Sequence, residues 1–183
     1  METQNKTFGD ACASGNIKVA KLSIMTGLKD RPKDLMPMIS SDDYYSLHMA
    51  CKKGHLGVVQ LLLETVLQHS PDDLMPMISS DNYYSLYWAC GNGYLEVVQL
   101  LIATVLQHSP NYLIPMISSW NYYSLQMACK NGRLGVARLL ISTVLQHNPN
   151  DLMPMMSSGN YVFLRLACNH GHRGVVQLLS NYV

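Results

Sequence analysis

The chain repeats itself at a fixed interval of 39 residues. The stretch DLMPMISSD occupies residues 34–42 and 73–81, and close variants of it begin at residues 112 and 151. An Ala-Cys pair recurs in the same register at 11–12, 50–51, 89–90, 128–129 and 167–168, and a glycine follows three residues after each cysteine. A period of 20–50 residues is typical of stacked units that are each too small to bury their apolar face alone. The period therefore predicts a repeat array.

The second copy carries the residues by which a repeat family can be identified. It begins YYSLHMACKKGHLGVVQLLLETVLQHSP at residue 44. This stretch resembles the ankyrin repeat, whose pattern is matched position by position at Leu47, His48, Ala50, Gly54, His55, Val58, Val59, Leu62 and Leu63. Two features depart from that pattern: Tyr45-Ser46 replaces the usual Thr-Pro, and the period is six residues longer than the usual ~33.

The resemblance implies an all-α fold, an ankyrin-type helix-pair repeat solenoid with long second helices and extended Pro-Met connectors. We expect a single domain over residues 1–183. Its repeats would span 1–39 as an N-terminal cap, then 40–78, 79–117 and 118–156, and 157–183 as a C-terminal cap.

Within a repeat, the spacing of apolar residues predicts two helices. The first runs from about Ser46 to Lys53, with Ser46 as N-cap, and Gly54 supplies the turn. The second begins near Leu56 and continues to about His69, because Val66 stands where the usual repeat has a helix-ending glycine. Repeat one carries Gly27 at that position, so its second helix is expected to stop earlier or to fray.

The Pro-Met stretch is interpreted as a connector that absorbs the extra length. Pro71 favours a short helix over residues 71–75, and Pro76 discourages its continuation, so a loop is expected over residues 77–82. The apolar connector residues would cover the base of the stack: Leu74, Met75, Met77 and Ile78. A docking motif is the alternative, but fourfold repetition at structural spacing favours the architectural role.

No pattern for catalysis or metal binding is found in the sequence. The five cysteines occupy one repeat position, and equivalent sites in a helical stack lie roughly 10 Å apart, too far for a disulfide. We interpret all five as small buried apolar residues of a reducing, cytoplasmic environment. His170 and His172 lack matching ligands, and no cofactor-binding loop or catalytic pair is present, so we expect no enzyme, metal or cofactor.

Charge and hydropathy narrow the classes of partner. Residues 54–129 contain five carboxylates and no lysine or arginine, whereas residues 130–183 contain five cations and one carboxylate. This distribution does not form a continuous basic stripe for nucleic acid. It fits a partner with its own charge pattern, head-to-tail self-contact, or simple drift among solvated side chains. No apolar run reaches the ~18 residues that span a bilayer, and no secretion signal is seen, so membrane association is not expected.

The copies disagree at positions that are free for recognition. The resemblance places the partner on the concave face made by loop tips and first helices, and there we expect binding residues at Asp42, Tyr44, His48, Asp81, Tyr83, Tyr87, Trp88, Trp120, Tyr122, Gln126 and Arg165. Trp120 and Tyr87 are each unique among the copies at their positions, which favours binding. The tyrosine present in every copy, such as Tyr44 and Tyr122, is expected to pack the loop against the next repeat instead.

The function that follows is a non-catalytic module that binds another protein. The resemblance extends to host-directed proteins of intracellular microbes and large viruses, so host cytosol is a second expected location. The alternative is a structural or self-associating array without a separate ligand.

Overall fold

The computed structural model describes residues 2–182, with side chains from Thr7 onward. These residues form eleven α-helices and four short 3₁₀ helices, and no strand occurs among them, which confirms the all-α prediction. The chain forms two compact units, one up to Ser85 and one from Leu86 onward. It passes between them inside α6 (Leu74–Asn92). The single domain expected over residues 1–183 stays a prediction.

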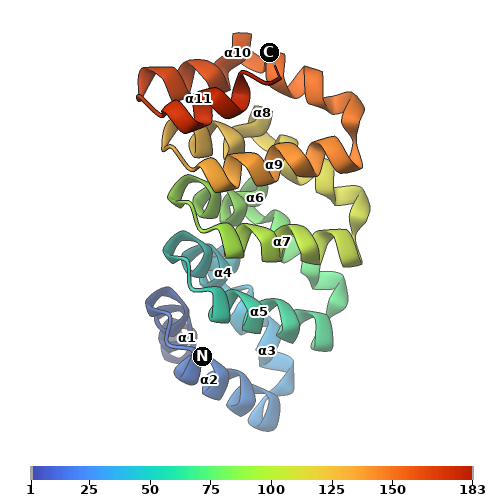
Figure 1. Ribbon diagram of the computed structural model, residues 1–183. Helices are drawn as coiled ribbons and strands as arrows, with labels where there is room; N and C mark the ends of the chain where they lie inside the picture. The colour runs from blue at the N-terminus through green and yellow to red at the C-terminus, as the bar shows by residue number, and fades with distance from the viewer. Residues whose placement is uncertain (1, 183) are drawn as a thin grey trace. The chain divides into compact units, whose positions relative to one another are not determined.

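The first unit contains two helix pairs and two connectors. The pairs are α1 (Glu2–Ser14) with α2 (Ile17–Asp30), and α4 (Ser41–Lys53) with α5 (Leu56–His69). The first helices α1 and α4 pack together, and so do the second helices α2 and α5, as Figure 1 shows. The connectors are a 3₁₀ turn followed by helix: η1 (Pro32–Asp34) with α3 (Leu35–Ile39), and η2 (Pro71–Asp73) with the start of α6.

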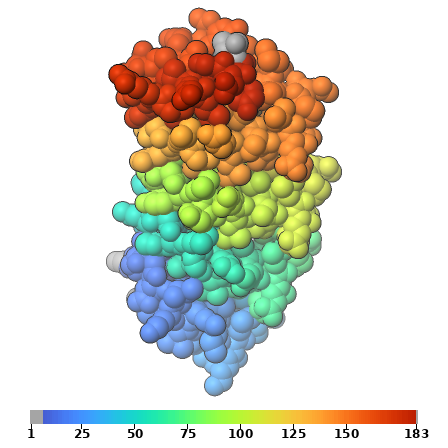
Figure 2. All heavy atoms as spheres, viewed as in Figure 1, coloured from blue at the N-terminus to red at the C-terminus, as the bar shows by residue number. Residues whose placement is uncertain are grey.

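The second unit repeats the same arrangement. After α6 come α7 (Leu95–His108), η3 (Pro110–Tyr112), α8 (Leu113–Lys130), α9 (Leu134–His147), η4 (Pro149–Asp151), α10 (Leu152–Asn169) and α11 (Arg173–Leu179). Here α8 packs on α10, and α9 packs on both α7 and α11. Figure 2 shows that side chains fill the spaces between these ribbons on the side in view.

The second helices end where the sequence predicts, with one exception. The helix α5 spans Leu56–His69, and its valine Val66 is fully buried. The expectation that Gly27 ends or frays α2 is wrong, because the helix continues to Asp30 and the Arg31 N–H donates to the Gly27 carbonyl at 2.9 Å. A glycine inside a helix costs only about 1 kcal/mol, which the packing of α2 outweighs.

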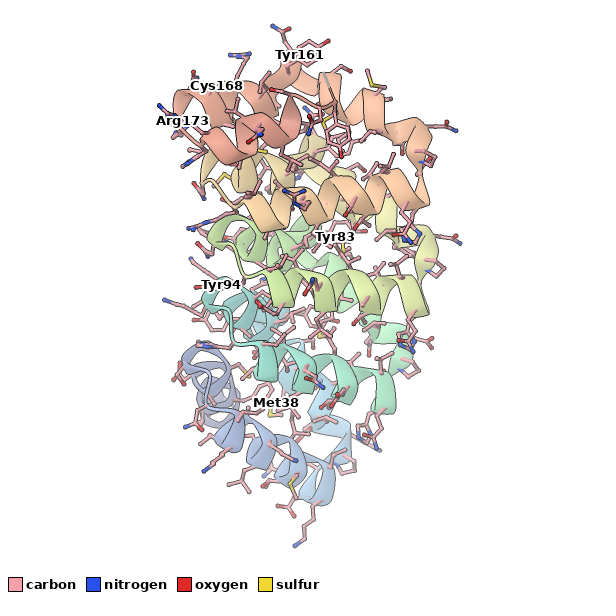
Figure 3. The ribbon with its side chains drawn as sticks, in the orientation of Figure 1. Met38, Tyr83, Tyr94, Tyr161, Cys168 and Arg173 are labelled. Carbon is pink, nitrogen blue, oxygen red and sulfur yellow. The ribbon has the colours of Figure 1, made fainter. Side chains whose placement is uncertain are left out.

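The loop expected over residues 77–82 is wrong for its first half, residues 77–79. The connector stays helical from Leu74 through Ser79, because Pro76 is the third residue of its helix. The N–H groups of the first turn have no intrahelical partner, so a proline there removes no hydrogen bond. The buried Leu74, Met77 and Ile78 confirm that the connector covers the core, and Figure 3 shows Met38 of the preceding connector pointing inward likewise.

A left-handed turn of three residues separates each connector from the following first helix. Its members are Asp42–Tyr44 in α4, Asp81–Tyr83 in α6, Trp120–Tyr122 in α8 and Gly159–Tyr161 in α10, all with φ between 47° and 64°. This conformation costs roughly 1–2 kcal/mol per ordinary residue but less for Asn and Asp, one of which stands second in every turn. Ser46 is therefore not an N-cap: it lies inside α4 and is buried, and this expectation is wrong.

A side chain of the next repeat forms a hydrogen bond to the turn between the two helices of a repeat. His55 Nε2 lies 3.2 Å from the Ala13 carbonyl, and His172 Nε2 lies 2.8 Å from the Lys130 carbonyl. Arg133 makes the equivalent bond from its Nε to the Gly91 carbonyl at 3.2 Å. Each of these side chains lies over a glycine of positive φ, where an added Cβ would come within 2.5–2.7 Å of it.

The cysteines follow the repeat position with one correction. Cys12, Cys51, Cys90 and Cys129 are buried, and all five cysteines carry free thiols. The expectation that all five are buried is wrong for Cys168, which is exposed. Figure 3 shows Cys168 at the end of α10, near Arg173 at the start of α11. No further repeat follows among the described residues to cover it.

Candidate functional site

Four aromatic side chains of the second unit form a continuous cluster, which we call the aromatic cluster: Tyr87, Trp88, Trp120 and Tyr123. The rings of Tyr87 and Tyr123 stack with centroids 5.0 Å apart and planes 8° apart. Trp88 meets Tyr87 edge-on at 5.0 Å, and Trp120 meets Tyr123 at 6.1 Å. Such pairs contribute about 0.5–1.5 kcal/mol beyond the area they bury. The cluster is therefore held in one geometry before any partner arrives.

The left-handed turn of α8 presents Trp120 to solvent. Its side chain is 54% exposed, while Met116 and Ile117 beneath the turn are buried. More than half of the indole is thus open to solvent and accessible to a partner. Two hydrogen bonds fix the next residue, Asn121: Gln126 donates to its carbonyl at 2.9 Å, and Ser158 donates to its Oδ1 at 2.6 Å.

Two of the tyrosines that end the left-handed turns, Tyr44 and Tyr122, pack inside their own units, whereas the packing expected of this position is wrong for Tyr161, which is 40% exposed. Tyr122 meets Phe163 of the following repeat edge-on at 6.4 Å. Burial, and next the Asp151 carboxylate, raise the pKa of the Tyr122 phenol above its ordinary value. Burial and the Asp73 carboxylate raise the pKa of Tyr44 in the same way. These contacts fit the expected packing role better than a binding role.

His48 of the first unit leaves little surface for a partner. It is only 9% exposed, and its ring meets Tyr84 edge-on at 5.4 Å. Its Nε2 is buried without a hydrogen-bond partner among the described residues. Burial lowers the pKa of His48, and Asp81, the Ser80 backbone and Asp43 offset this in part. Little of the His48 ring is therefore accessible to a partner.

The other predicted residues are distributed over both units. The structure brings Tyr87, Trp88 and Trp120 together in the aromatic cluster. Asp42 and Asp81 are exposed in the left-handed turns of the first unit, where Tyr83 is half-buried, and in the second unit Gln126 is half-buried and Arg165 is exposed. Sequence reasoning missed Tyr123, although Tyr45, Tyr84 and Tyr123 recur at one position and an aromatic so placed can join two neighbouring copies.

The part of the chain that the structure describes contains neither a group of metal ligands nor a candidate membrane span. Among those residues, no three His, Cys, Asp or Glu side chains gather in a group that could hold a metal ion. None of the described helices is both long and apolar enough to cross a bilayer.

Comparison with protein families and with solved structures gives matches in both. A family model described as ankyrin repeats (three copies) matches residues 8–113, more than half of the 183 residues. Among solved structures, an ankyrin repeat family protein from Legionella pneumophila superposes with a TM-score of 0.53 at 16% identity. That match covers 98% of this chain and 72% of the other. No curated protein matches.

Proposed function

This chain belongs to the ankyrin repeat family, and we propose that it binds another protein through the face that carries the aromatic cluster. Ankyrin repeats are generally protein–protein interaction modules, and the family is typically non-enzymatic. The observation that supports this face most is the exposed Trp120, which contacts Tyr123 and lies in a turn whose next residue, Asn121, accepts two hydrogen bonds.

The cluster has the properties of a binding anchor. Trp and Tyr dominate the energetics of many interfaces because they bury a large apolar area at a small cost in side-chain entropy. The equivalents of Trp120 are Asp42, Asp81 and Gly159, so the indole is not required for stacking the repeats. Burying it against a partner can contribute about 2 kcal/mol or more to binding.

The variant Trp120→Asp tests the proposal, because it copies the residue that two sister repeats carry in the same left-handed conformation. Tyr112→Asp is the matched control. Tyr112 is also an exposed aromatic, at 48%, lies outside the cluster, and has aspartate at its equivalent positions Asp34, Asp73 and Asp151. We expect both variants to keep the melting temperature of the parent.

The measurement is affinity purification with the full chain as bait, followed by mass spectrometry and titration of the captured protein. We expect Trp120→Asp to weaken binding about tenfold or more, which corresponds to 1.4 kcal/mol, and Tyr112→Asp to leave it unchanged. Equal affinity of Trp120→Asp and the parent would remove the cluster from the binding surface.

Self-association is the second candidate, and exposed apolar side chains such as Met153 favour it. Light scattering over a range of concentrations separates the two. A dimer that Trp120→Asp abolishes would make the partner a second copy of this chain. The host-directed role and the cytoplasmic location expected from the sequence stay predictions.

A further inference from the structure

The junction between the second and third repeats buries a histidine that the repeat pattern does not require. The His48 ring in α4 is 9% exposed and meets the ring of Tyr84 in α6. Its Nε2 has no hydrogen-bond partner among the described residues. The other copies carry four different residues at this position: Gly9, Tyr87, Gln126 and Arg165. Stacking of the repeats therefore does not demand an imidazole here.

Carboxylates from two left-handed turns act on this imidazole. Asp43 belongs to the turn of α4 and Asp81 to the turn of α6, and the charge of each reaches His48. The two turns are joined directly, because Ser80 Oγ donates to the Asp43 carbonyl at 2.9 Å. Asp81 has φ of 47°, and a residue in this region keeps its conformation only where its surroundings hold it. A change in the charge of His48 thus acts on a turn that depends on its neighbours.

The same combination of titratable groups does not recur in the later repeats. At the positions of Asp43, His48 and Asp81, the next junction carries Asn82, Tyr87 and Trp120, and the one after it carries Asn121, Gln126 and Gly159. None of these six residue types changes charge between about pH 5 and 8. The repeat fold is therefore built without this triplet, and sensitivity to pH is confined to one junction.

The charges around His48 come from few groups. Burial lowers the pKa of His48 most, and the carboxylates of Asp81 and Asp43 offset this in part. Tyr84 faces the ring from α6, and Lys52 stands four residues after His48, on the same side of α4. The helices α1, α3 and α5 also pack on α4, and their described residues add no charge that acts on the imidazole.

We infer that His48 is a pH-sensitive switch for the turn over Asp81, Asn82 and Tyr83. Protonated histidine carries N–H groups at both ring nitrogens, so Nε2–H then requires an acceptor. The described arrangement offers none, and Asp81 forms no ion pair with the ring. A buried charge without a partner is strongly unfavourable. Protonation should therefore move the turn out of its left-handed conformation, so that the Asp81 carboxylate can reach the imidazolium.

Two-dimensional NMR of the full chain tests this switch between about pH 5 and 7.5, where histidine titrates. We expect the His48 ring signals and the amide signals of Asp81, Asn82 and Tyr83 to change with one common midpoint. Circular dichroism over the same range should show that the helices stay intact. The equivalent turn at residues 120–122 is the internal control, and its amides should not respond.

Substitutions in the two turns and at His48 locate the effect. His48→Gln should abolish the response of the turn. Asp81→Asn should move the midpoint to lower pH, because a charge that favours the imidazolium is lost, and Asp43→Asn should do the same without altering that turn. Asp42→Asn is the matched control: Asp42 is the equivalent of Asp81 in the preceding repeat, where Gly9 takes the place of the histidine. This variant should keep the parent midpoint.

The inference is overturned if the His48 ring titrates while the amides of residues 81–83 do not respond, or if their response survives in His48→Gln. Equal midpoints for the parent, Asp81→Asn and Asp43→Asn would refute the role of the carboxylates. Amide changes that appear only with loss of the circular dichroism signal would be acid unfolding, and would also overturn it. None of these measurements involves a partner, so their outcome is independent of the proposed function.

Discussion

Replacing Gly132 with alanine should destabilise the second unit through two separable effects. Gly132 has φ of 69°, and an alanine in this left-handed region costs roughly 1–2 kcal/mol. The added Cβ would also lie 2.5 Å from Nδ1 of His172, closer than van der Waals contact allows. His172 must move, and it then loses the 2.8 Å hydrogen bond from its Nε2 to the Lys130 carbonyl.

The lost hydrogen bond sets the size of the second effect. The bond is exposed, so its loss costs about 0.5–1 kcal/mol, at the low end of the usual range. The total expected for Gly132→Ala is therefore about 1.5–3 kcal/mol. Gly171→Ala is the matched control: its φ is 73°, but nothing lies within 4 Å of the added Cβ, so only the backbone cost applies.

Urea denaturation followed by circular dichroism measures both variants, and amide hydrogen exchange in α11 reports on the last repeat separately, because repeat arrays can unfold in parts. Combining His172→Ala with Gly132→Ala completes a double-mutant cycle, in which we expect a coupling of about 0.5–1 kcal/mol. Equal destabilisation by Gly132→Ala and Gly171→Ala, with no coupling to His172, would refute a stabilising contact of His172 with the preceding turn.

Three further predictions concern single positions. Burial raises the pKa of Cys12 to about 11 and of Cys51 and Cys129 to about 12. A thiol reagent at pH 8 should therefore modify the exposed Cys168 quickly and the other four cysteines only after unfolding. Fast modification of a second thiol in the folded chain would contradict the burial of these four. Val105→Gly should lower the free energy of unfolding by about 2–4 kcal/mol, because glycine is unfavourable in a helix and the buried valine side chain is lost. Gly27→Ala should raise the free energy of unfolding by about 0.5–1 kcal/mol, because the added Cβ meets only Leu35, at 3.9 Å. A Val105→Gly variant more stable than the parent would contradict the long second helix. Burial lowers the pKa of His48 below 6.5, so the contribution of neutral His48 to folding stability is fully present above pH 6.5 and is lost as the pH falls towards the folded pKa. His48→Gln, which copies the equivalent Gln126, should flatten this pH dependence of the melting temperature. An unchanged pH dependence would assign it to other groups.

The sequence by itself determined the repeat and its helices. Apolar residues at helical spacing, such as Val58, Val59, Leu62 and Leu63, fix the second helix because its stability depends on one continuous buried stripe. The glycine of each inner turn is fixed likewise, since positive φ is a local requirement that few other residues meet. The family resemblance rests on these positions, and the family match and the helix bounds confirm it.

The conformation of the connectors could be predicted from the sequence only in part. Pro76 was expected to end a helix, but the effect of a proline depends on its distance from the helix start, which the preceding 3₁₀ turn sets. The left-handed turns had a signal in Asp43, Asn82 and Asn121, yet three consecutive left-handed residues are unfavourable in isolation. They persist where neighbours hold them, as Ser80 holds the Asp43 carbonyl at 2.9 Å.

The tertiary structure decided which of the candidate residues lie together in the aromatic cluster. Tyr87 and Tyr123 stand 36 residues apart and stack only because adjacent repeats place their first helices side by side. His48 is buried, whereas its equivalents Tyr87 and Gln126 are half-buried and Arg165 is exposed. Four of the five equivalent cysteines are likewise buried, and Cys168 is exposed. Periodicity gives each residue the same local conformation in every copy, but burial depends on what lies against that copy, and that is a property of the packed array.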